Sequence, residues 1–200
     1  EEQLCATADE AVAAAGALGF PVALKIASPN ILHKTETGGV ELDLGTADDV
    51  SHAFAAVTGR ARLAAPDARI DGVLVSRMVT AGVETILGVQ HDPTFGPVVM
   101  FGLGGIFVET LKDVSFRVAP FEDDEAHRMM RELTGFPLLE GVRGRQRCDL
   151  DAVAAALSAL SRFAAAHTGQ LESAELNPVV VFEEGRGLLA LDALLVPKRP

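Results

Sequence analysis

Apolar and polar residues recur with a helical period in the first part of the chain and then alternate with a period of two. Residues 7–19 read as an alanine-rich helix, in which Thr7 and Glu10 match a capping box and Gly19 stands where a helix would end. The compact apolar run 20–27 and the alternating run 40–44 are typical of strands. The pattern therefore predicts a helix followed by two strands.

A second helix is expected from about Ala47, with Thr46 as its cap and Gly59 as an interruption that leaves its end open. Later runs predict four strands, two helices and a final β-hairpin. The strands are expected at 72–79, 83–90, 97–105 and 114–120, the helices at 122–133 and 149–167, and the hairpin at 171–182 and 187–196.

The pattern changes near Met78–Gly82. Before this point the order is helix, strand, strand, helix, strand, and after it an antiparallel sheet with flanking helices is expected, which is an α+β arrangement. We therefore expect two α+β lobes, residues 1–79 and 80–200, with a ligand cleft between them.

Composition narrows the class of function. A formal net charge of −11 and the absence of Trp and Tyr argue against nucleic-acid binding, which depends on basic and stacking side chains. Cys5 and Cys148 lie far apart without metal-ligand spacing, which indicates a reducing cytoplasm and no zinc site. Glycines break the apolar runs, so we expect no membrane segment and no signal peptide.

Basic and glycine residues gather in and after the second predicted segment. Lys25 interrupts an apolar strand, where its ammonium group must reach water or meet an anion such as phosphate. Lys34 and the N–H groups around Gly38 and Gly39 suit phosphate oxygens. The alternatives are an edge-strand lysine that faces water and an ordinary connection between strands.

His33 lies in the same loop, next to Lys34. A histidine is neutral and nucleophilic near neutral pH, so beside a bound phosphate it can accept a phosphoryl group. A capping or surface role is the alternative.

Polar residues also interrupt the apolar hairpin at the C-terminal end. Opposed strands would bring Asn177 and Asp192 together, and hard oxygen donors suit Mg²⁺ bound to nucleotide phosphates. Glu175, two residues before Asn177, is expected on the same face. The alternative is that these residues simply face solvent.

Two further charges lie in strand-like runs. Glu84 would accept a hydrogen bond from a ribose or ligate a metal, and Arg117 would donate a hydrogen bond to phosphate. Each residue is equally suited to a structural ion pair. The GLGG sequence at 102–105 lacks the spacing of a dinucleotide-binding turn, so close packing of backbones is the better interpretation.

Three blocks of the sequence together resemble a known family. Residues 19–44, 82–120 and 174–193 are similar, in order, to the ATP-grasp domain, or β subunit, of NDP-forming acyl-CoA synthetases, the relatives of succinyl-CoA synthetase. The resemblance covers nearly the whole chain and implies an ATP-grasp fold with the nucleotide between two lobes. It also implies that a further segment with a helix precedes Glu1.

The resemblance assigns roles to residues of this chain. It implies that Asn177 and Asp192 ligate Mg²⁺ and that Glu175 approaches a phosphohistidine during transfer. Phosphate would bind Lys25, and Glu84 would match the acidic position on the strand after the hinge. The hinge would lie beside adenine and contact it largely through the backbone groups of Ser76, Arg77 and Met78.

The family resemblance also implies a reaction. His33 would relay phosphate to ADP, so that acyl-CoA, ADP and phosphate give acid, CoA and ATP. The implied cofactors are ATP or ADP and Mg²⁺. The implied partner is an α subunit or a fused CoA-binding portion, which carries the primary phosphohistidine and binds CoA and the carboxylic acid.

Two other functions remain open at this stage. One is a noncatalytic regulatory module, because similar regions are fused to protein acetyltransferases; retention of His33, Lys25, Asn177 and Asp192 favours catalysis instead. The other is an ATP-grasp ligase that passes an acyl phosphate to an amine, against which the loop histidine argues.

Overall fold

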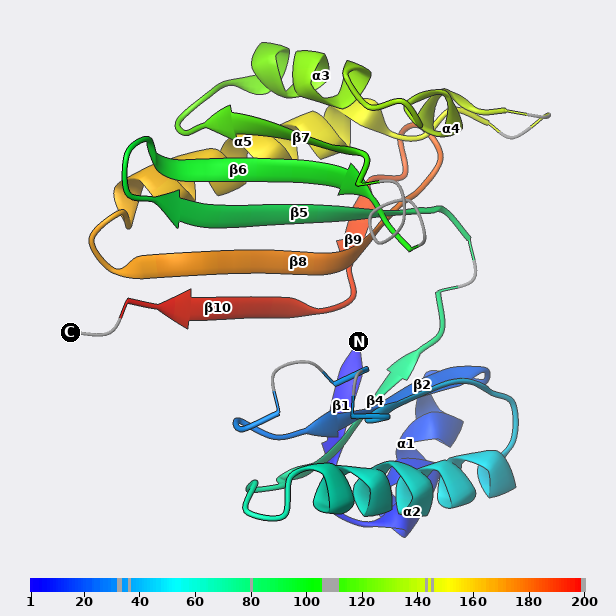
Figure 1. Ribbon diagram of the computed structural model, residues 1–200. Coiled ribbons are helices and arrows are strands. Elements are labelled where there is room, and N and C mark those ends of the chain that lie inside the picture. Colours follow the sequence, from blue (N-terminus) through cyan, green and yellow to red (C-terminus); the bar gives the residue numbers. More distant parts are fainter. Residues whose placement is uncertain are drawn as a thin grey trace. The chain divides into compact units, whose positions relative to one another are not determined.

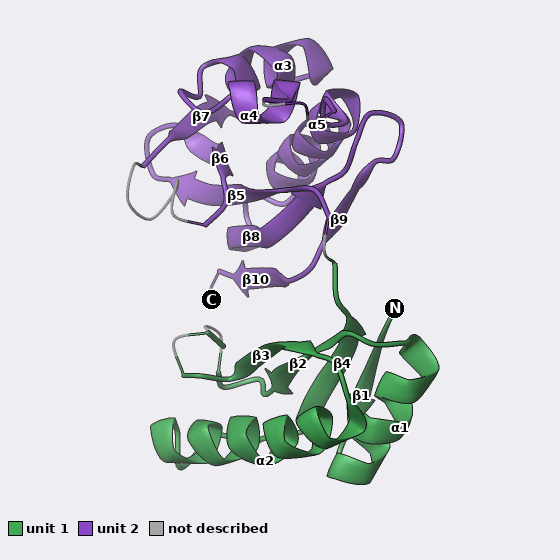
Figure 2. Ribbon diagram, turned by 90° about the vertical axis from the view of Figure 1, so that its right-hand side faces the viewer, with its two compact units in different colours: residues 1–80 green, residues 81–200 purple. Residues whose placement is uncertain are grey.

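The chain forms two compact units in a computed structural model, Glu1–Thr80 and Ala81–Pro200 (Figure 2). The division falls where the sequence pattern changes, and each unit has its own hydrophobic core. The structure describes residues 1–31, 34–35, 37–79, 81–105, 112–142, 144 and 146–198.

Unit 1 is a four-stranded antiparallel sheet in the order β1-β4-β2-β3, with two helices on one face (Figure 1). The predicted elements are confirmed, but the short strand β1 was not expected from the sequence. The elements are β1 (Glu2–Cys5), α1 (Ala8–Leu18), β2 (Val22–Ala27), β3 (Val40–Leu44), α2 (Ala47–Ala64) and β4 (Gly72–Arg77).

Side chains cap the two helices of unit 1. In α1 the Thr7 side chain accepts from the N–H of Glu10, but the Glu10 carboxylate accepts from Ala6, one residue before the cap. In α2 Thr46 forms a complete capping box. Gly59 does not end α2, which continues to Ala64, because one glycine inside a packed helix costs only about 1 kcal/mol.

Unit 2 is a six-stranded antiparallel sheet in the order β10-β8-β5-β6-β7, with β9 paired to β8. Its helices α3 and α5 cover one face (Figure 1). The elements are β5 (Val83–Asp92), β6 (Gly96–Leu103), β7 (Val114–Val118), α3 (Asp123–Arg131), α4 (Pro137–Glu140), α5 (Leu150–Ala166), β8 (Leu171–Val181), β9 (Leu188–Ala190) and β10 (Ala193–Pro197). The sequence did not predict the four-residue helix α4, and the second strand of the expected hairpin, 187–196, is divided into β9 and β10.

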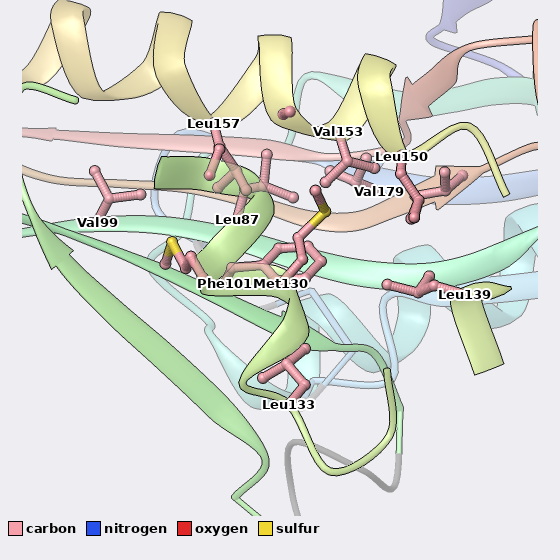
Figure 3. Packing of buried hydrophobic residues seen from close by; sticks show 14 of the residues in the cluster. Leu87, Val99, Phe101, Met130, Leu133, Leu139, Leu150, Val153, Leu157 and Val179 are labelled. Atoms are coloured by element: carbon pink, nitrogen blue, oxygen red, sulfur yellow. The ribbon is translucent and has the colours of Figure 1, made fainter. Parts of the chain in front are cut away.

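The core of unit 2 lies between the sheet and its two long helices. Figure 3 shows Leu87 and Phe101 from the sheet beside Met130 of α3 and Leu157 of α5, and all four side chains are fully buried. Burying an apolar side chain of this size contributes about 2 kcal/mol to folding. Among the described residues, no helix has both the length and the apolar composition needed to cross a bilayer.

Candidate functional site

The C-terminal hairpin brings Asn177 and Asp192 together, as the sequence predicts. The N–H of Asn177 donates to the carbonyl of Asp192 at 3.1 Å, and the N–H of Leu191 donates to the carbonyl of Pro178 at 2.9 Å. The Asn177 side-chain Nδ2 lies 2.9 Å from Glu175 Oε1. This contact confirms that Glu175 and Asn177 share one face of β8.

The Glu175 contact determines which end of the Asn177 amide points away. An ionised carboxylate only accepts hydrogen bonds, so the amide nitrogen must face Glu175 and Oδ1 is directed elsewhere. Asp192 is half-buried next to it, and its Oδ1 accepts from the N–H of Ala193 at 2.9 Å. An amide oxygen and two nearby carboxylates are hard donors that suit Mg²⁺.

A purely acidic or histidine-rich metal centre is not found in the part of the chain that the structure describes. No three His, Cys, Asp or Glu side chains come close enough there to hold a metal ion. The candidate site therefore depends on the amide of Asn177 as well as on carboxylates.

A β-bulge lies at this site, and the sequence analysis missed it. Thr85 pairs with Val179 and Leu87 pairs with Leu176, so two residues of β8 oppose Ile86 of β5. The sequence signal for the bulge was Pro178 within a predicted strand. In sheets, proline is confined to edge strands, to the first residue of a strand and to bulges.

Lys25 lies on an interior strand of unit 1. Its strand β2 pairs with β3 on one side and with β4 on the other, where Lys25 faces Val40 and Leu74. The edge-strand alternative is therefore wrong. The Lys25 side chain is half-buried. Its ammonium group is therefore still expected to meet an anionic ligand or a local polar group.

The glycine turn that follows His33 is held by its own hydrogen bonds. The N–H of Gly38 donates to Thr35 at 3.0 Å, and the N–H of Gly39 donates to the carbonyl of Lys34 at 2.7 Å. Both N–H groups are thus used inside the turn, and in this conformation they do not face a phosphate. A Cβ at Gly39 would lie 2.6 Å from Ile26 Cγ2, so close packing explains the glycine.

Arg60 of α2 holds this turn from outside. Its Nε donates to the carbonyl of Gly38 at 2.7 Å, and its guanidinium pairs with Glu41 at 2.5 Å. His33 itself lies outside the described residues. The half-buried Lys34 is within them, directly before the turn.

The predicted hinge residues continue the sheet of unit 1. Ser76 of β4 pairs with Glu2 on one side and with Ala23 on the other. The N–H of Met78 donates to the carbonyl of Pro21 at 3.0 Å, whereas the Arg77 side chain is exposed. The N–H of Met78 is therefore engaged within unit 1.

Glu84 is exposed at the start of β5, where its backbone meets the GLGG sequence. The N–H of Gly104 donates to the carbonyl of Glu84 at 2.7 Å, and a Cβ at Gly104 would lie 2.8 Å from the Glu84 Cβ. Close backbone packing, the interpretation preferred from the sequence, is confirmed at Gly104.

Arg117 forms structural ion pairs, the alternative to phosphate binding that the sequence left open. Its guanidinium on β7 donates to Glu125 at 2.6 Å and to Glu132 at 2.5 and 3.0 Å. These hydrogen bonds raise the pKa of Arg117 and lower the pKa of both glutamates. A catalytic role for Arg117 is therefore not favoured, because two carboxylates already neutralise its charge.

The sequence matches the ATP-grasp domain family over residues 1–196. The chain belongs to the ATP-grasp family. Within this family it is 40% identical over 198 residues to the β subunit of ADP-forming acetate–CoA ligase II from Pyrococcus furiosus, covering 99% of this chain and 84% of the relative. It is 47% identical over 177 residues to ADP-forming acetate–CoA ligase I from Archaeoglobus fulgidus, covering 88% of this chain and 26% of that protein.

Solved structures of ATP-grasp proteins agree with the fold. The acetyl-coenzyme A synthetase 1 of Ca. Korarchaeum cryptofilum, in complex with coenzyme A and Ca-AMPCP, has a TM-score of 0.90 and 38% identity over 99% of this chain and 85% of that one. A protein from Pyrococcus horikoshii Ot3 has a TM-score of 0.92 and 38% identity over 100% of this chain and 84% of that one. This ATP-grasp chain thus spans most of the Pyrococcus furiosus β subunit but only about a quarter of the Archaeoglobus fulgidus ligase.

Proposed function

We propose that this ATP-grasp chain performs the nucleotide half-reaction of an ADP-forming acyl-CoA synthetase. The observation that carries the proposal is the opposed pair of Asn177 and Asp192, with Glu175 bonded to the amide, in a chain that matches the ATP-grasp family over residues 1–196. ATP-grasp enzymes bind nucleotide, and the two acid–thiol ligases compared above are named as ADP-forming.

Asn177 and Asp192 would hold the metal ion, and the chemistry of their oxygen atoms fits Mg²⁺. When bound, Mg²⁺ would reduce the repulsion between the negative phosphate oxygens. Glu175 keeps Oδ1 of Asn177 turned away from itself through the bond at 2.9 Å. It is also the carboxylate that would accept the N–H of an incoming imidazole ring and so orient it.

Lys25 and Lys34 would bind the phosphates of the nucleotide through charge-assisted hydrogen bonds. A ring nitrogen of neutral His33 would attack the terminal phosphorus of ATP. The new N–P bond forms as the bond from phosphorus to the bridging oxygen breaks, and ADP leaves with that electron pair. In the direction of ATP synthesis the same step runs backwards.

The remaining chemistry would belong to a partner. Two relatives from Pyrococcus furiosus are named β subunits, and the Archaeoglobus fulgidus ligase is about four times as long as the part matched by this chain. We assign CoA, the carboxylic acid and the primary phosphohistidine to an α subunit or a fused portion. One synthetase structure of this family has a phosphohistidine segment that points towards the nucleotide-binding site. A cytoplasmic location accords with Cys5 and Cys148, which are both buried and form no disulfide.

The test is transfer of label from terminally labelled ATP to the protein in the presence of Mg²⁺. Acid-labile, base-stable label on the parent chain, lost in His33→Asn, supports the relay. His52→Asn is the matched control, because His52 is an exposed histidine of α2 in the same unit. Label that survives in His33→Asn would contradict the assignment of His33.

A chain that binds nucleotide but takes up no label would be tested again with a synthetase α subunit added. Label that then appears would show that transfer from ATP needs the partner's histidine. Absence of label in both assays would support the regulatory alternative, in which phosphotransfer has been lost.

A further inference from the structure

The bulge beside Asn177 is held by a side chain to which the proposed function assigns no role. Thr85 of β5 is fully buried, and its Oγ1 donates to the carbonyl of Val179 at 2.9 Å. Val179 comes directly after the two bulged residues, Asn177 and Pro178. The hydroxyl of Thr85 therefore fixes the chain where the bulge ends.

On the opposite side of β8, next to β9 and the start of β10, the ladder has no such irregularity from Val179 to Leu176. There Val179 pairs with Ala190, and the N–H of Leu191 donates to the carbonyl of Pro178. The N–H of Asn177 in turn donates to the carbonyl of Asp192. The bulge thus changes the register only towards β5, and the position of Asn177 opposite Asp192 is kept. A change in the bulge would move the Asn177 amide relative to the Asp192 carboxylate.

Burial explains why the hydroxyl of Thr85 matters. Residues 85–89 of β5 are all buried, and a buried hydroxyl without a partner would be costly, so the bond to Val179 is strongly favoured over alternatives. Valine has nearly the same shape as threonine but cannot donate. It would fill the same space and leave the Val179 carbonyl without this donor.

We propose that Thr85 is a positioning residue for the divalent cation site of Asn177 and Asp192. The inference rests on the proposed function, since it requires these two side chains to bind the metal. Thr85 does not touch the metal. It sets the backbone from which Asn177 presents Oδ1, as residues behind metal ligands commonly do.

The experiment is a titration of the folded chain with Mn²⁺, followed by electron paramagnetic resonance of the free ion, with no nucleotide and no activity assay. Thr85→Val should weaken Mn²⁺ binding about 10-fold, and Thr85→Ser, which keeps the hydroxyl, should bind within about twofold of the parent. Thr58→Val is the matched control. Thr58 is also buried, but its hydroxyl donates to Phe54 within α2, so Mn²⁺ affinity should not change.

Two ligand variants separate this inference from the proposed function. If Asn177→Ala and Asp192→Asn leave Mn²⁺ affinity unchanged, the metal site is wrong and the role of Thr85 is overturned with it. If both weaken binding while Thr85→Val binds like the parent, the metal site stands and only the role of Thr85 is overturned. Thr85→Cys, a weaker donor, replaces the valine variant if that variant does not fold, and parental affinity would again overturn the inference.

Discussion

Arg117 of β7 and Glu132, which ends α3, form two parallel hydrogen bonds, from NH1 to Oε2 at 3.0 Å and from NH2 to Oε1 at 2.5 Å. The Nε–H of Arg117 donates to Oε1 of Glu125 at 2.6 Å. The paired arrangement matches the planar shape of guanidinium to that of carboxylate. It joins β7 to α3, and the charge of Arg117 is used within unit 2.

Removal of the guanidinium should therefore lower stability and leave nucleotide chemistry intact. We expect Arg117→Met to lower the Tm by about 3 °C at pH 7, because Glu132 loses its cation and Glu125 keeps only Arg128. Nucleotide affinity should stay within about twofold of the parent. Thermal unfolding and calorimetry measure these two quantities. An unchanged Tm together with a large loss of affinity would return Arg117 to the ligand site.

Asp149 should make unit 2 sensitive to acid. Its carboxylate accepts from the N–H groups of Ala152 at 3.1 Å and Gly187 at 2.8 Å, and these bonds lower the pKa of Asp149. A carboxyl group whose pKa is lower in the folded state stabilises the fold at any pH above its pKa in the unfolded state, which is about 4. This stabilisation is lost as the pH falls through the lower pKa of the folded state.

We expect Asp149→Ala to reduce the free energy of unfolding by about 1 kcal/mol at pH 7, as for other lost helix caps. The difference from the parent should shrink as the pH falls below about 4. Urea unfolding at several pH values measures it. A difference that stays constant down to pH 2 would show that the carboxylate charge of Asp149 is not involved.

Two glycine substitutions should have opposite effects. Gly59 lies inside α2 and an added Cβ meets nothing within 4 Å, so Gly59→Ala should stabilise by about 0.5–1 kcal/mol. At Gly104 the added Cβ would lie 2.8 Å from the Glu84 Cβ, so Gly104→Ala should destabilise by about 1–3 kcal/mol. Chemical denaturation compares both with the parent. Equal effects at the two positions would contradict the close packing at Gly104.

Lys25 should contribute to nucleotide binding. Loss of a charge-assisted phosphate contact costs about 1.5–3 kcal/mol, so Lys25→Met should weaken Mg-ATP binding about 10- to 100-fold in calorimetry. Lys198→Met is the matched control, because Lys198 donates to the carbonyl of Thr168 in the other unit. Unchanged affinity for Lys25→Met would remove Lys25 from the site.

The sequence by itself determined the features that depend on near neighbours. Helix caps at Thr7 and Thr46 act over three residues, and strand alternation placed Glu175 and Asn177 on one face. The final hairpin joins strands that follow each other, so the meeting of Asn177 with Asp192 was also predictable. Capping and alternation are local, because they arise from backbone geometry within one turn or two residues.

Only the tertiary structure decided which distant groups meet. It made β2 an interior strand, gave Arg117 its partners 8 and 15 residues away, and placed Thr85 against Val179, 94 residues along the chain. Such pairs depend on sheet order and register, which the packing of a whole core selects and no short window of sequence contains. Local patterns therefore identify the chemical groups at this site, and the fold determines which side chains hold them in place.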